Sequence, residues 1–450
     1  MRIRALVALL CAFLFSVAAH AQDGPIKVEV VQEGDSWMLH RDGKPYYVKG
    51  AGGKDHLDIV VDAGGNSIRT WSLDNAQEIL DEAHAHGLTV MMGLWVGHER
   101  HGFDYDNEKA IEQQFARFKA AIPKFKDHPA LLCWAVGNEV NLFYKNHKVW
   151  YAVNDIAKMI KELDPNHPVT TVTAGLAQQE VTLIKERCPD LDFLSVNTYG
   201  DLVKLKGNIR TFGWNGPYMV TEWGPNGHWE VAKTEWDTPL EQTSSEKAVS
   251  YRERYNEFIA GDKSLCMGSY VFLWGQKQET TASWYGLFSE KGESTEAVDV
   301  LYESWSGKPP ANQSPKLISL KVDGKGQTEN VRLQAEDIFE ATVETSDPDK
   351  DKLKISWEIV PESTDIKAGG DKESKPASVV GLIKSTKGNT MRFRAPRQEG
   401  AYRVFVWVRD GNNHVAYANV PFYTAPRPPG TPQAQFMRLK QVDMNSFNEQ

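Results

Sequence analysis

Between residues 44 and 305, short apolar segments typical of strands alternate with segments that have helical periodicity. Residues 74–86 illustrate the helical type, because Asp74 can cap the start of the segment and Gly87 can end it. The expected strands begin near Tyr46, Ser67, Thr89, Leu131, Val169, Phe193, Tyr218 and Met267. Strands that alternate with helices predict a parallel sheet with the helices packed outside it. Eight such units predict an α/β fold of one kind, the (β/α)8 TIM barrel.

Other segments flank the expected barrel. Residues 28–49 indicate a hairpin that turns at Asp42-Gly43 and closes the bottom of the barrel, so the barrel domain is placed at residues 22–305. Residues 316–424 change to a period of two, as at Val404, Val406 and Val408, which predicts a small all-β sandwich domain. The proline-containing residues 306–315 are expected to form a linker, and residues 425–450 a poorly ordered tail.

The first residues indicate export. Arg2 and Arg4 precede an apolar run, residues 5–18, that is too short to span a bilayer. Residues 19–21, Ala-His-Ala, offer small residues for cleavage. We therefore expect residues 1–21 to be a signal peptide, and the mature chain to be secreted or periplasmic without insertion in the membrane.

Charge and cysteine content exclude several classes of protein. The formal net charge is −9 and no basic cluster is present in the sequence, which disfavours nucleic acid as a partner. Four cysteines, one of them in the expected signal peptide, do not indicate a disulfide framework. Cys133 lies within an apolar strand and is expected to belong to the core.

Two glutamates lie where apolar strands end. Glu139 follows the fourth expected strand and Glu222 ends the seventh. The carboxyl ends of barrel strands meet at one mouth, where the chemistry of such a barrel takes place. Cleavage of a glycosidic bond needs one carboxyl group as proton donor and a second as nucleophile or base. The pair is therefore predicted to be catalytic.

Four motifs carry a resemblance to a known family. Residues 128–139, which end in Trp-Ala-Val-Gly-Asn-Glu, resemble the acid/base strand of family 2 glycoside hydrolases and their clan A relatives. Residues 65–70, 195–200 and 220–224 are similar to the second, sixth and seventh strand ends of that family. Family 2 members carry domains before the barrel for which this sequence has no counterpart, so an open cleft is expected rather than a closed pocket.

The resemblance implies a retaining mechanism. Glu139 would protonate the leaving oxygen and Glu222 would attack the anomeric carbon. Arg69 would hold Glu222 ionised, and Asn138 would bind the 2-hydroxyl of the sugar. Tyr199 would donate a hydrogen bond to Glu222.

Aromatic and polar residues near the strand ends are candidates for sugar contact. Trp274 would be the floor on which the reacting sugar stacks. For each aromatic residue the alternative is packing in the core or in a loop. The further candidates are Trp95, His98, Asn197, Trp223 and Trp284.

We expect neither a metal nor a cofactor. His98 and His101 are three apart, one residue short of the zinc protease spacing, so sugar contact or loop structure is favoured. Asp347, Asp349 and Asp351 have the offsets of a calcium loop, but Lys352 stands where the sharp turn needs glycine. A plain acidic turn is favoured there.

The sequence thus predicts an exported retaining β-glycoside hydrolase that acts on a β-linked polysaccharide or oligosaccharide, with a β-glucan as the first guess. A β-glucan-remodelling transglycosidase shares the first half-reaction and remains an alternative. A glycan-binding protein without activity is a second alternative. The sandwich resembles polycystic-kidney-disease-type or immunoglobulin-like modules, and its role stays open.

Overall fold

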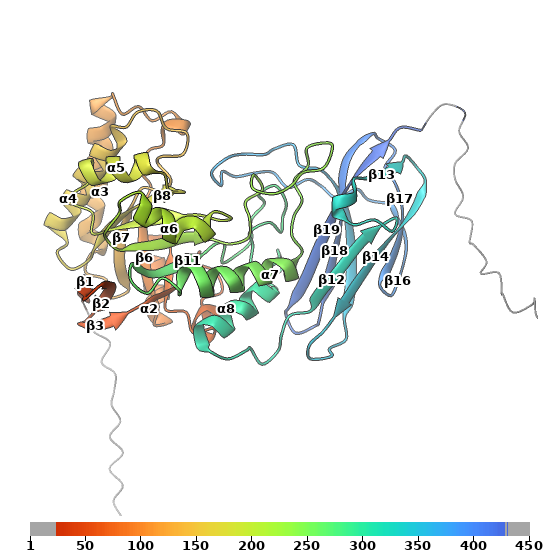
Figure 1. Cartoon of the computed structure of the whole chain (residues 1–450), viewed down its shortest axis with the longest axis horizontal. Coiled ribbons are helices and arrows are strands. Elements are labelled where there is room, and N and C mark those ends of the chain that lie inside the picture. The colour runs from red at the N-terminus through yellow and green to blue at the C-terminus, as the bar shows by residue number, and fades with distance from the viewer. Residues whose placement is uncertain (1–23, 428–429, 431–450) are drawn as a thin grey trace, which may run out of the picture.

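The computed structural model of the chain describes residues 24–427 and residue 430. The expected signal peptide and most of the expected tail therefore lie outside the described residues. The described chain forms a barrel domain and a sandwich domain that lie side by side (Figure 1). Among the described helices, none is both long and apolar enough to cross a membrane.

The eight expected strands form a closed parallel barrel in the order β10-β11-β4-β5-β6-β7-β8-β9. The strands are β4 (Val48–Gly52), β5 (Ser67–Arg69), β6 (Thr89–Leu94), β7 (Leu131–Val136), β8 (Val169–Ala174), β9 (Phe193–Asn197), β10 (Tyr218–Trp223) and β11 (Cys266–Val271). The helices are α1 (Leu57–Asp62), α2 (Ala76–Ala85), α3 (Glu108–Phe125), α4 (Val149–Leu163), α5 (Gln178–Arg187), α6 (Leu202–Thr211), α7 (Ser244–Glu253) and α8 (Glu296–Ser306). The predicted TIM barrel is confirmed.

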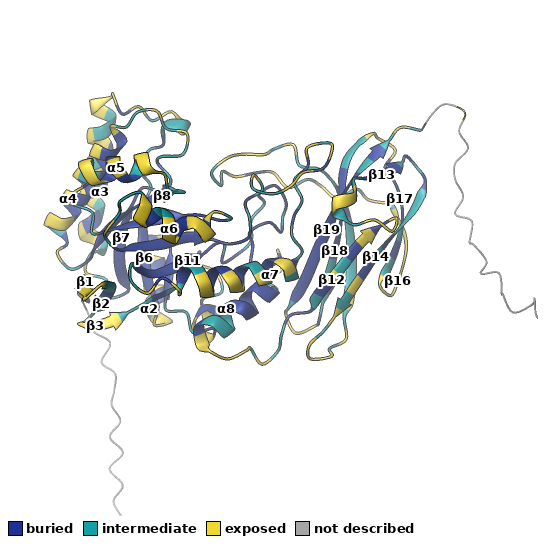
Figure 2. Cartoon of the chain, viewed as in Figure 1, coloured by how far each residue is buried: buried dark blue, intermediate teal, exposed yellow. Residues whose placement is uncertain are grey.

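Alternation along the strands divides the apolar side chains between two cores. Side chains such as Met91 and Leu132 fill the inside of the barrel, and their neighbours, such as Val90 and Leu131, pack between the strands and the helices. Both sets are buried, so the strands are dark blue along their length in Figure 2. Cys133 lies in the inner core, as expected.

A small antiparallel sheet lies under the barrel. It has three strands, β1 (Val28–Glu33), β2 (Ser36–Arg41) and β3 (Lys44–Tyr46), where the sequence analysis expected a hairpin. Val28 and Leu39 are buried and belong to the same apolar cluster as the inside of the barrel. The sheet therefore covers the end of the barrel opposite the strand ends that carry the two glutamates.

The C-terminal domain consists of two four-stranded sheets, ordered β12-β14-β17-β16 and β13-β19-β18-β15, as the predicted all-β sandwich requires. A separate apolar cluster, which includes Val404, Val406 and Val408, lies between them. The strands are β12 (Lys316–Val322), β13 (Val331–Gln334), β14 (Ile338–Ser346), β15 (Lys354–Pro361), β16 (Ile383–Lys387), β17 (Thr390–Arg394), β18 (Gly400–Arg409) and β19 (Val415–Ala425). The relation to immunoglobulin-like modules stays a prediction.

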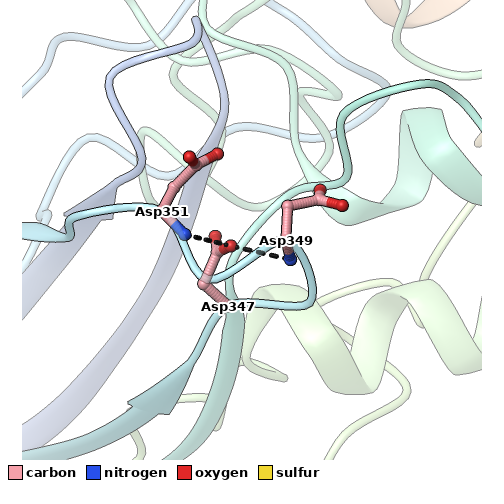
Figure 3. A group of neighbouring side chains, drawn as sticks. All are labelled: Asp347, Asp349 and Asp351. Carbon is pink, nitrogen blue, oxygen red and sulfur yellow. Dashed lines mark hydrogen bonds between the residues drawn. The ribbon is translucent and has the colours of Figure 1, made fainter.

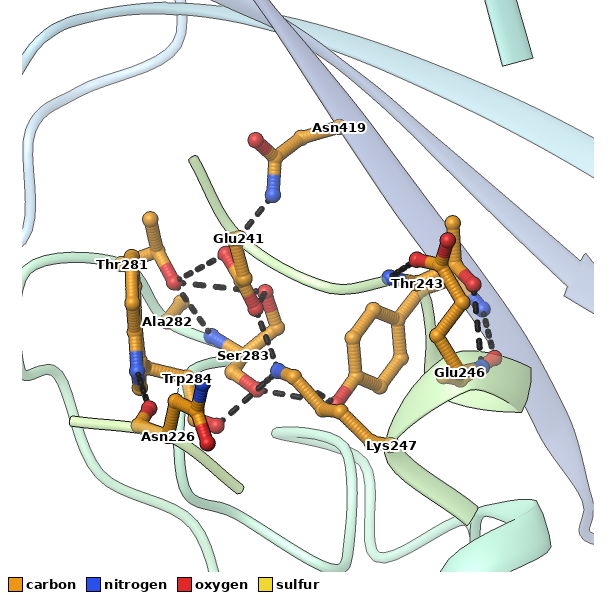
Figure 4. Close-up of polar contacts among 12 residues, drawn as sticks. Asn226, Glu241, Thr243, Glu246, Lys247, Thr281, Ala282, Ser283, Trp284 and Asn419 are labelled. Atoms are coloured by element: carbon orange, nitrogen blue, oxygen red, sulfur yellow. Dashed lines mark hydrogen bonds and ion pairs between the residues drawn. The ribbon is translucent and has the colours of Figure 1, made fainter. Parts of the chain in front are cut away.

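Buried polar contacts join the two domains (Figure 4). Glu241 and Lys247, both from the barrel domain, form an ion pair at 2.6 Å with almost no exposed side-chain surface. Lys247 Nζ also donates to Tyr417 Oη at 3.1 Å, and Asn419 Nδ2 donates to Glu241 Oε2 at 2.7 Å. Tyr417 and Asn419 belong to β19 of the sandwich. Since buried polar groups are costly unless they are paired, these contacts favour one relative position of the domains.

We predict that Lys247→Met destabilises the protein by about 3–5 kcal/mol, because Glu241 would remain buried without its counter-charge. Chemical denaturation followed by tryptophan fluorescence measures this change. The double variant Lys247→Met, Glu241→Gln should recover part of the loss. A double variant no more stable than the single one would contradict the explanation.

Candidate active site

Both glutamates line one cavity of about 270 Å³ at the carboxyl ends of the barrel strands. Glu139 follows β7 and Glu222 lies within β10, two barrel strands that β8 and β9 separate. The residues that line the cavity are Trp71, Trp95, Asn138, Glu139, Tyr199, Glu222, Trp229, Phe272, Leu273, Lys277, Glu279, Gly369, Gly370 and Asp371.

Three donors hold the carboxylate of Glu222. Arg69 Nη1 donates to Oε1 at 2.9 Å, and Trp71 Nε1 donates to the same oxygen at 2.7 Å. Tyr199 Oη donates to Oε2 at 3.1 Å. Hydrogen bonds to a carboxylate are among the stronger ones in proteins. They fix the position of Glu222 and stabilise its negative charge.

A chain of hydrogen bonds connects the two glutamates. Arg69 Nη2 donates to Asn138 Oδ1 at 2.6 Å, so one guanidinium contacts both Glu222 and the residue before Glu139. Asn197 Nδ2 donates to Asn138 Oδ1 at 3.1 Å and to Glu139 Oε1 at 3.0 Å. Arg69 and Asn197 lie behind the cavity wall, where they orient its carboxyl groups.

Glu139 differs from Glu222 in its surroundings. Loss of hydration, the largest cause, and then the charge of Glu222 raise the pKa of Glu139 from 4.5 to about 7. The hydrogen bond from Asn197 and the charge of Arg69 act in the opposite direction. The carboxyl group of Glu139 is therefore largely protonated below pH 7, as a proton donor must be.

The backbone at Glu139 is unusual. Its φ of 54° lies in the left-handed region, which costs a non-glycine residue about 1–2 kcal/mol. Gly137, two residues earlier, has a φ of 78°. Val172 O accepts a hydrogen bond from the N–H of Glu139 at 2.9 Å and holds this turn against β8. The turn directs the carboxyl group into the mouth of the barrel.

His98 supports the site but does not line the cavity, so the prediction of direct sugar contact is wrong. The side chain is buried, and its Nε2 lies 2.5 Å from the carbonyl oxygen of Asn138. Burial lowers the pKa of His98 to about 4, so the ring is neutral at pH 7 and donates through Nε2. Its ring packs on Trp95, which does line the cavity as expected.

The predictions for Trp223 and Trp274 are wrong, because both indoles are completely buried outside the cavity. Alternation along β10 turns Trp223 away from the mouth and onto Tyr251 and Tyr255. Trp274 packs on Trp305 of α8, with 5.9 Å between the ring centroids.

Phe272 lines the cavity where Trp274 was expected to form the floor. It directly follows β11, the eighth strand of the barrel, which ends at Val271. The residue that enters the mouth after this strand is therefore Phe272, two positions before the predicted Trp274.

Trp284 is likewise buried outside the cavity, against the prediction of sugar contact. Its Nε1 donates to Asn226 O at 2.9 Å, and its ring lies behind the wall beside Tyr285.

Trp71 and Trp229 line the cavity. The sequence places both in the predicted rim loops, where some tryptophans were expected to line sugar subsites, but no signal separated them from packing residues. Sequence reasoning missed other residues of the cavity. Lys277 and Glu279 form an ion pair at 2.8 Å after β11, where two charged residues follow an apolar strand. Residues 369–371 belong to the sandwich domain, and no local pattern connects them with the barrel.

No described group near His98 converges on a metal position. Glu99 Oε2 accepts hydrogen bonds from the backbone N–H groups of Lys145 at 2.6 Å and Asn146 at 2.9 Å, and His101 pairs with Asp371 at 3.0 Å. These contacts fit the expected loop structure.

The carboxylates of Asp347, Asp349 and Asp351 lie near one another (Figure 3), with one oxygen of each within 4.8 Å of the others. Asp347 Oδ1 accepts from the N–H groups of Asp349 and Asp351, each at 2.9 Å. These bonds form an acidic turn. The expectation that the turn holds no metal stays a prediction.

Comparison with known proteins agrees with this geometry. Residues 55–229 match the family model described as glycosyl hydrolases family 2, TIM barrel domain. The match supports the resemblance of the barrel to the catalytic domain of family 2 glycoside hydrolases of clan A.

Three relatives illustrate the extent of the similarity. β-Glucuronidase from Sus scrofa is 23% identical over 242 residues, which cover 49% of this chain and 32% of that protein. Mannan endo-1,4-β-mannosidase F from Aspergillus clavatus is 40% identical over 75 residues, 16% of this chain and 17% of that one. A solved β-glucuronidase from an uncultured Clostridium has a TM-score of 0.50 at 18% identity, covering 63% of this chain and 54% of that one, and shares the fold. The chain thus spans about half or less of the length of these proteins.

We predict that Glu222→Gln lowers the pKa of Glu139, because it removes a neighbouring negative charge. The pKa should stay above 4.5, since loss of hydration is the larger cause of the shift. Carbon-13 NMR titration of glutamate-labelled protein measures both values, with Glu139→Gln as the assignment control. An unchanged pKa would contradict the electrostatic coupling of the two carboxyl groups.

Proposed function

We propose that the chain is an exported glycoside hydrolase that cleaves β-linked glycans with retention of configuration. The observation that carries the proposal is the pair of carboxyl groups in one cavity, one held by three donors and the other with a pKa of about 7. Export rests on the expected signal peptide at residues 1–21.

In the first half-reaction, a Glu222 oxygen attacks the anomeric carbon as the glycosidic bond breaks. The proton of Glu139 passes to the leaving oxygen, so the departing sugar leaves as a neutral alcohol. The glycosyl group remains on Glu222 as an ester. Glu139, now a carboxylate, takes a proton from water in the second half-reaction, and the resulting hydroxide displaces Glu222.

Asn138 is suited to bind the reacting sugar. Its Oδ1 accepts hydrogen bonds from Arg69 and Asn197, which fixes the orientation of the amide. Its Nδ2 is the group left to donate to a sugar hydroxyl at the cavity. Aromatic rings of Trp71, Trp95 and Phe272 in the wall offer apolar surfaces to the faces of a sugar.

We infer that the sugar is neutral. Recognition of a uronic acid needs a cation that can pair with its carboxylate. Among the described residues that line the cavity, Lys277 is the only basic side chain, and it already pairs with Glu279 at 2.8 Å. Lys277 also donates to Gly370 O at 2.7 Å. A neutral β-glycan, with a β-glucan as the first candidate, is therefore favoured over a glucuronide.

The mature chain and its Glu222→Gln variant should be incubated with β-glucans, β-mannans, β-galactans and an aryl β-glucuronide. We expect a neutral glycan to be cleaved into products of retained configuration, at a rate at least about a thousandfold lower in the variant. Products longer than the input would indicate the transglycosidase. Binding without cleavage would indicate the glycan-binding protein, and preferred cleavage of the glucuronide would contradict the neutral substrate.

Loss of the Trp71 hydrogen bond should slow the reaction. We predict that Trp71→Phe lowers kcat about 10- to 150-fold, because a hydrogen bond to a charged group contributes about 1.5–3 kcal/mol. Steady-state kinetics on the cleaved substrate measure the loss. Trp223→Phe, which changes a buried indole outside the cavity, should keep kcat within about threefold of wild type. Equal losses in both variants would contradict a specific role for Trp71.

A further inference from the structure

One wall of the cavity comes from the sandwich domain. Residues 362–382 connect β15 with β16, and we call them the β15–β16 loop. The loop extends from the sandwich towards the barrel (Figure 1). Gly369, Gly370 and Asp371 line the cavity together with the two glutamates. A segment that follows Glu222 by 147 residues in sequence thus belongs to the same site.

Ion pairs and hydrogen bonds attach the loop to two sides of the barrel mouth. Asp371 pairs with Arg100 at 2.8 Å and with His101 at 3.0 Å, both in the loop that follows β6. On the other side, Lys277 Nζ donates to Gly370 O at 2.7 Å. Glu373 Oε2 accepts from the N–H of Thr280 at 2.6 Å. Lys277 and Thr280 follow β11.

The position of these attachments in the barrel defines what the loop covers. Strands β4 and β5 lie between β11 and β6 in the barrel order. The attachments beyond β11 and beyond β6 therefore bridge two parts of the mouth that β4 and β5 separate. The cavity that remains, about 270 Å³, lies just below the usual range of about 300–1,000 Å³ for ligand sites. The loop therefore adds a wall from a second domain to a site that the sequence analysis expected to be an open cleft.

Two glycines allow the loop to approach this closely. Gly369 and Gly370 have φ values of 64° and 70°, a conformation that other residues rarely adopt. A Cβ at Gly369 would lie 2.6 Å from Leu142 Cδ2, close to the turn that carries Glu139. The backbone of the loop is therefore part of the wall itself.

We propose that the β15–β16 loop closes one end of the substrate cleft, so that the enzyme binds the end of a neutral β-glycan rather than an internal stretch. This inference rests on the function proposed above. The sandwich domain then determines where along a chain the barrel cleaves. The sandwich domain affects how many sugar units the cleft can bind. The chemistry of Glu139 and Glu222 does not depend on the sandwich domain.

The test compares the full loop with a variant in which a short glycine–serine linker replaces residues 367–374. Asp371→Ala, which breaks the attachment to Arg100 and His101, provides a second variant that preserves the chain length. Lys375→Ala is the matched control. Lys375 lies in the same loop and pairs with Glu290 outside the loop at 2.8 Å, but it does not line the cavity. Thermal unfolding of each variant shows whether it is folded.

Binding is measured first, in proteins that also carry Glu222→Gln. Calorimetric titration uses cello-, laminari- and manno-oligosaccharides of increasing length. For the protein with the full loop, affinity should stop rising once the oligosaccharide has about two or three sugar units. For the protein with the shortened loop, longer oligosaccharides should bind about tenfold more tightly. Asp371→Ala should show a smaller gain, and Lys375→Ala none. The same dependence on length with and without the loop would overturn the proposal, as would no binding to either protein.

Products are then compared in the active proteins. The full loop should release one short product from chain ends, and the shortened loop should release fragments of many lengths. Internal cleavage by the wild-type chain would overturn the proposal that the loop closes one end of the cleft. If no protein shows cleavage that depends on Glu222, the proposed hydrolase fails. The binding series still decides the role of the loop, so the two failures are distinguishable.

Discussion

One buried guanidinium connects the parts of this active site. Arg69 ends β5, and its side chain is 1% exposed. It donates to Glu222 and to Thr221 O on β10, and to Asn138 beyond β7. A buried charge is costly unless it is paired and its N–H groups find acceptors. The barrel must therefore close with β5, β7 and β10 in this arrangement, and that arrangement brings the two carboxyl groups into one cavity.

The two glutamates have the same chemical group and different surroundings. Glu222 receives hydrogen bonds from Arg69, Trp71 and Tyr199, all of which stabilise its charge. Glu139 receives one hydrogen bond, from Asn197, and loses hydration, so its neutral form is favoured. Burial and hydrogen bonding thus suit the two groups to the proposed roles of nucleophile and proton donor, and the charge of Glu222 affects Glu139.

Much of the barrel could be predicted from the sequence, because the apolar strands and the turns between them are local patterns. The strand ends also indicated Glu139 and Glu222, which the structure brings together. The directions of Trp223 and Trp274 could not be predicted as reliably, because a shift of one residue along a strand moves a side chain to the opposite face. His98 acts through the backbone of Asn138, and its neighbours are set by tertiary packing. The pairing of Asp371 with Arg100 connects residues from two domains, so no local pattern reveals it.

A wall supplied by a second domain is useful only if the two domains keep their relative position. The buried contacts of Glu241 and Lys247 with β19 meet this requirement, because separation of the domains would expose or leave unpaired several polar groups at once. Arg403 of β18 adds a hydrogen bond to Pro239 O at 2.8 Å. None of these interface residues lines the cavity of Glu139 and Glu222, yet they hold the sandwich from which the β15–β16 loop extends. Stability of the interface and selectivity for substrate length are therefore two consequences of the same packing.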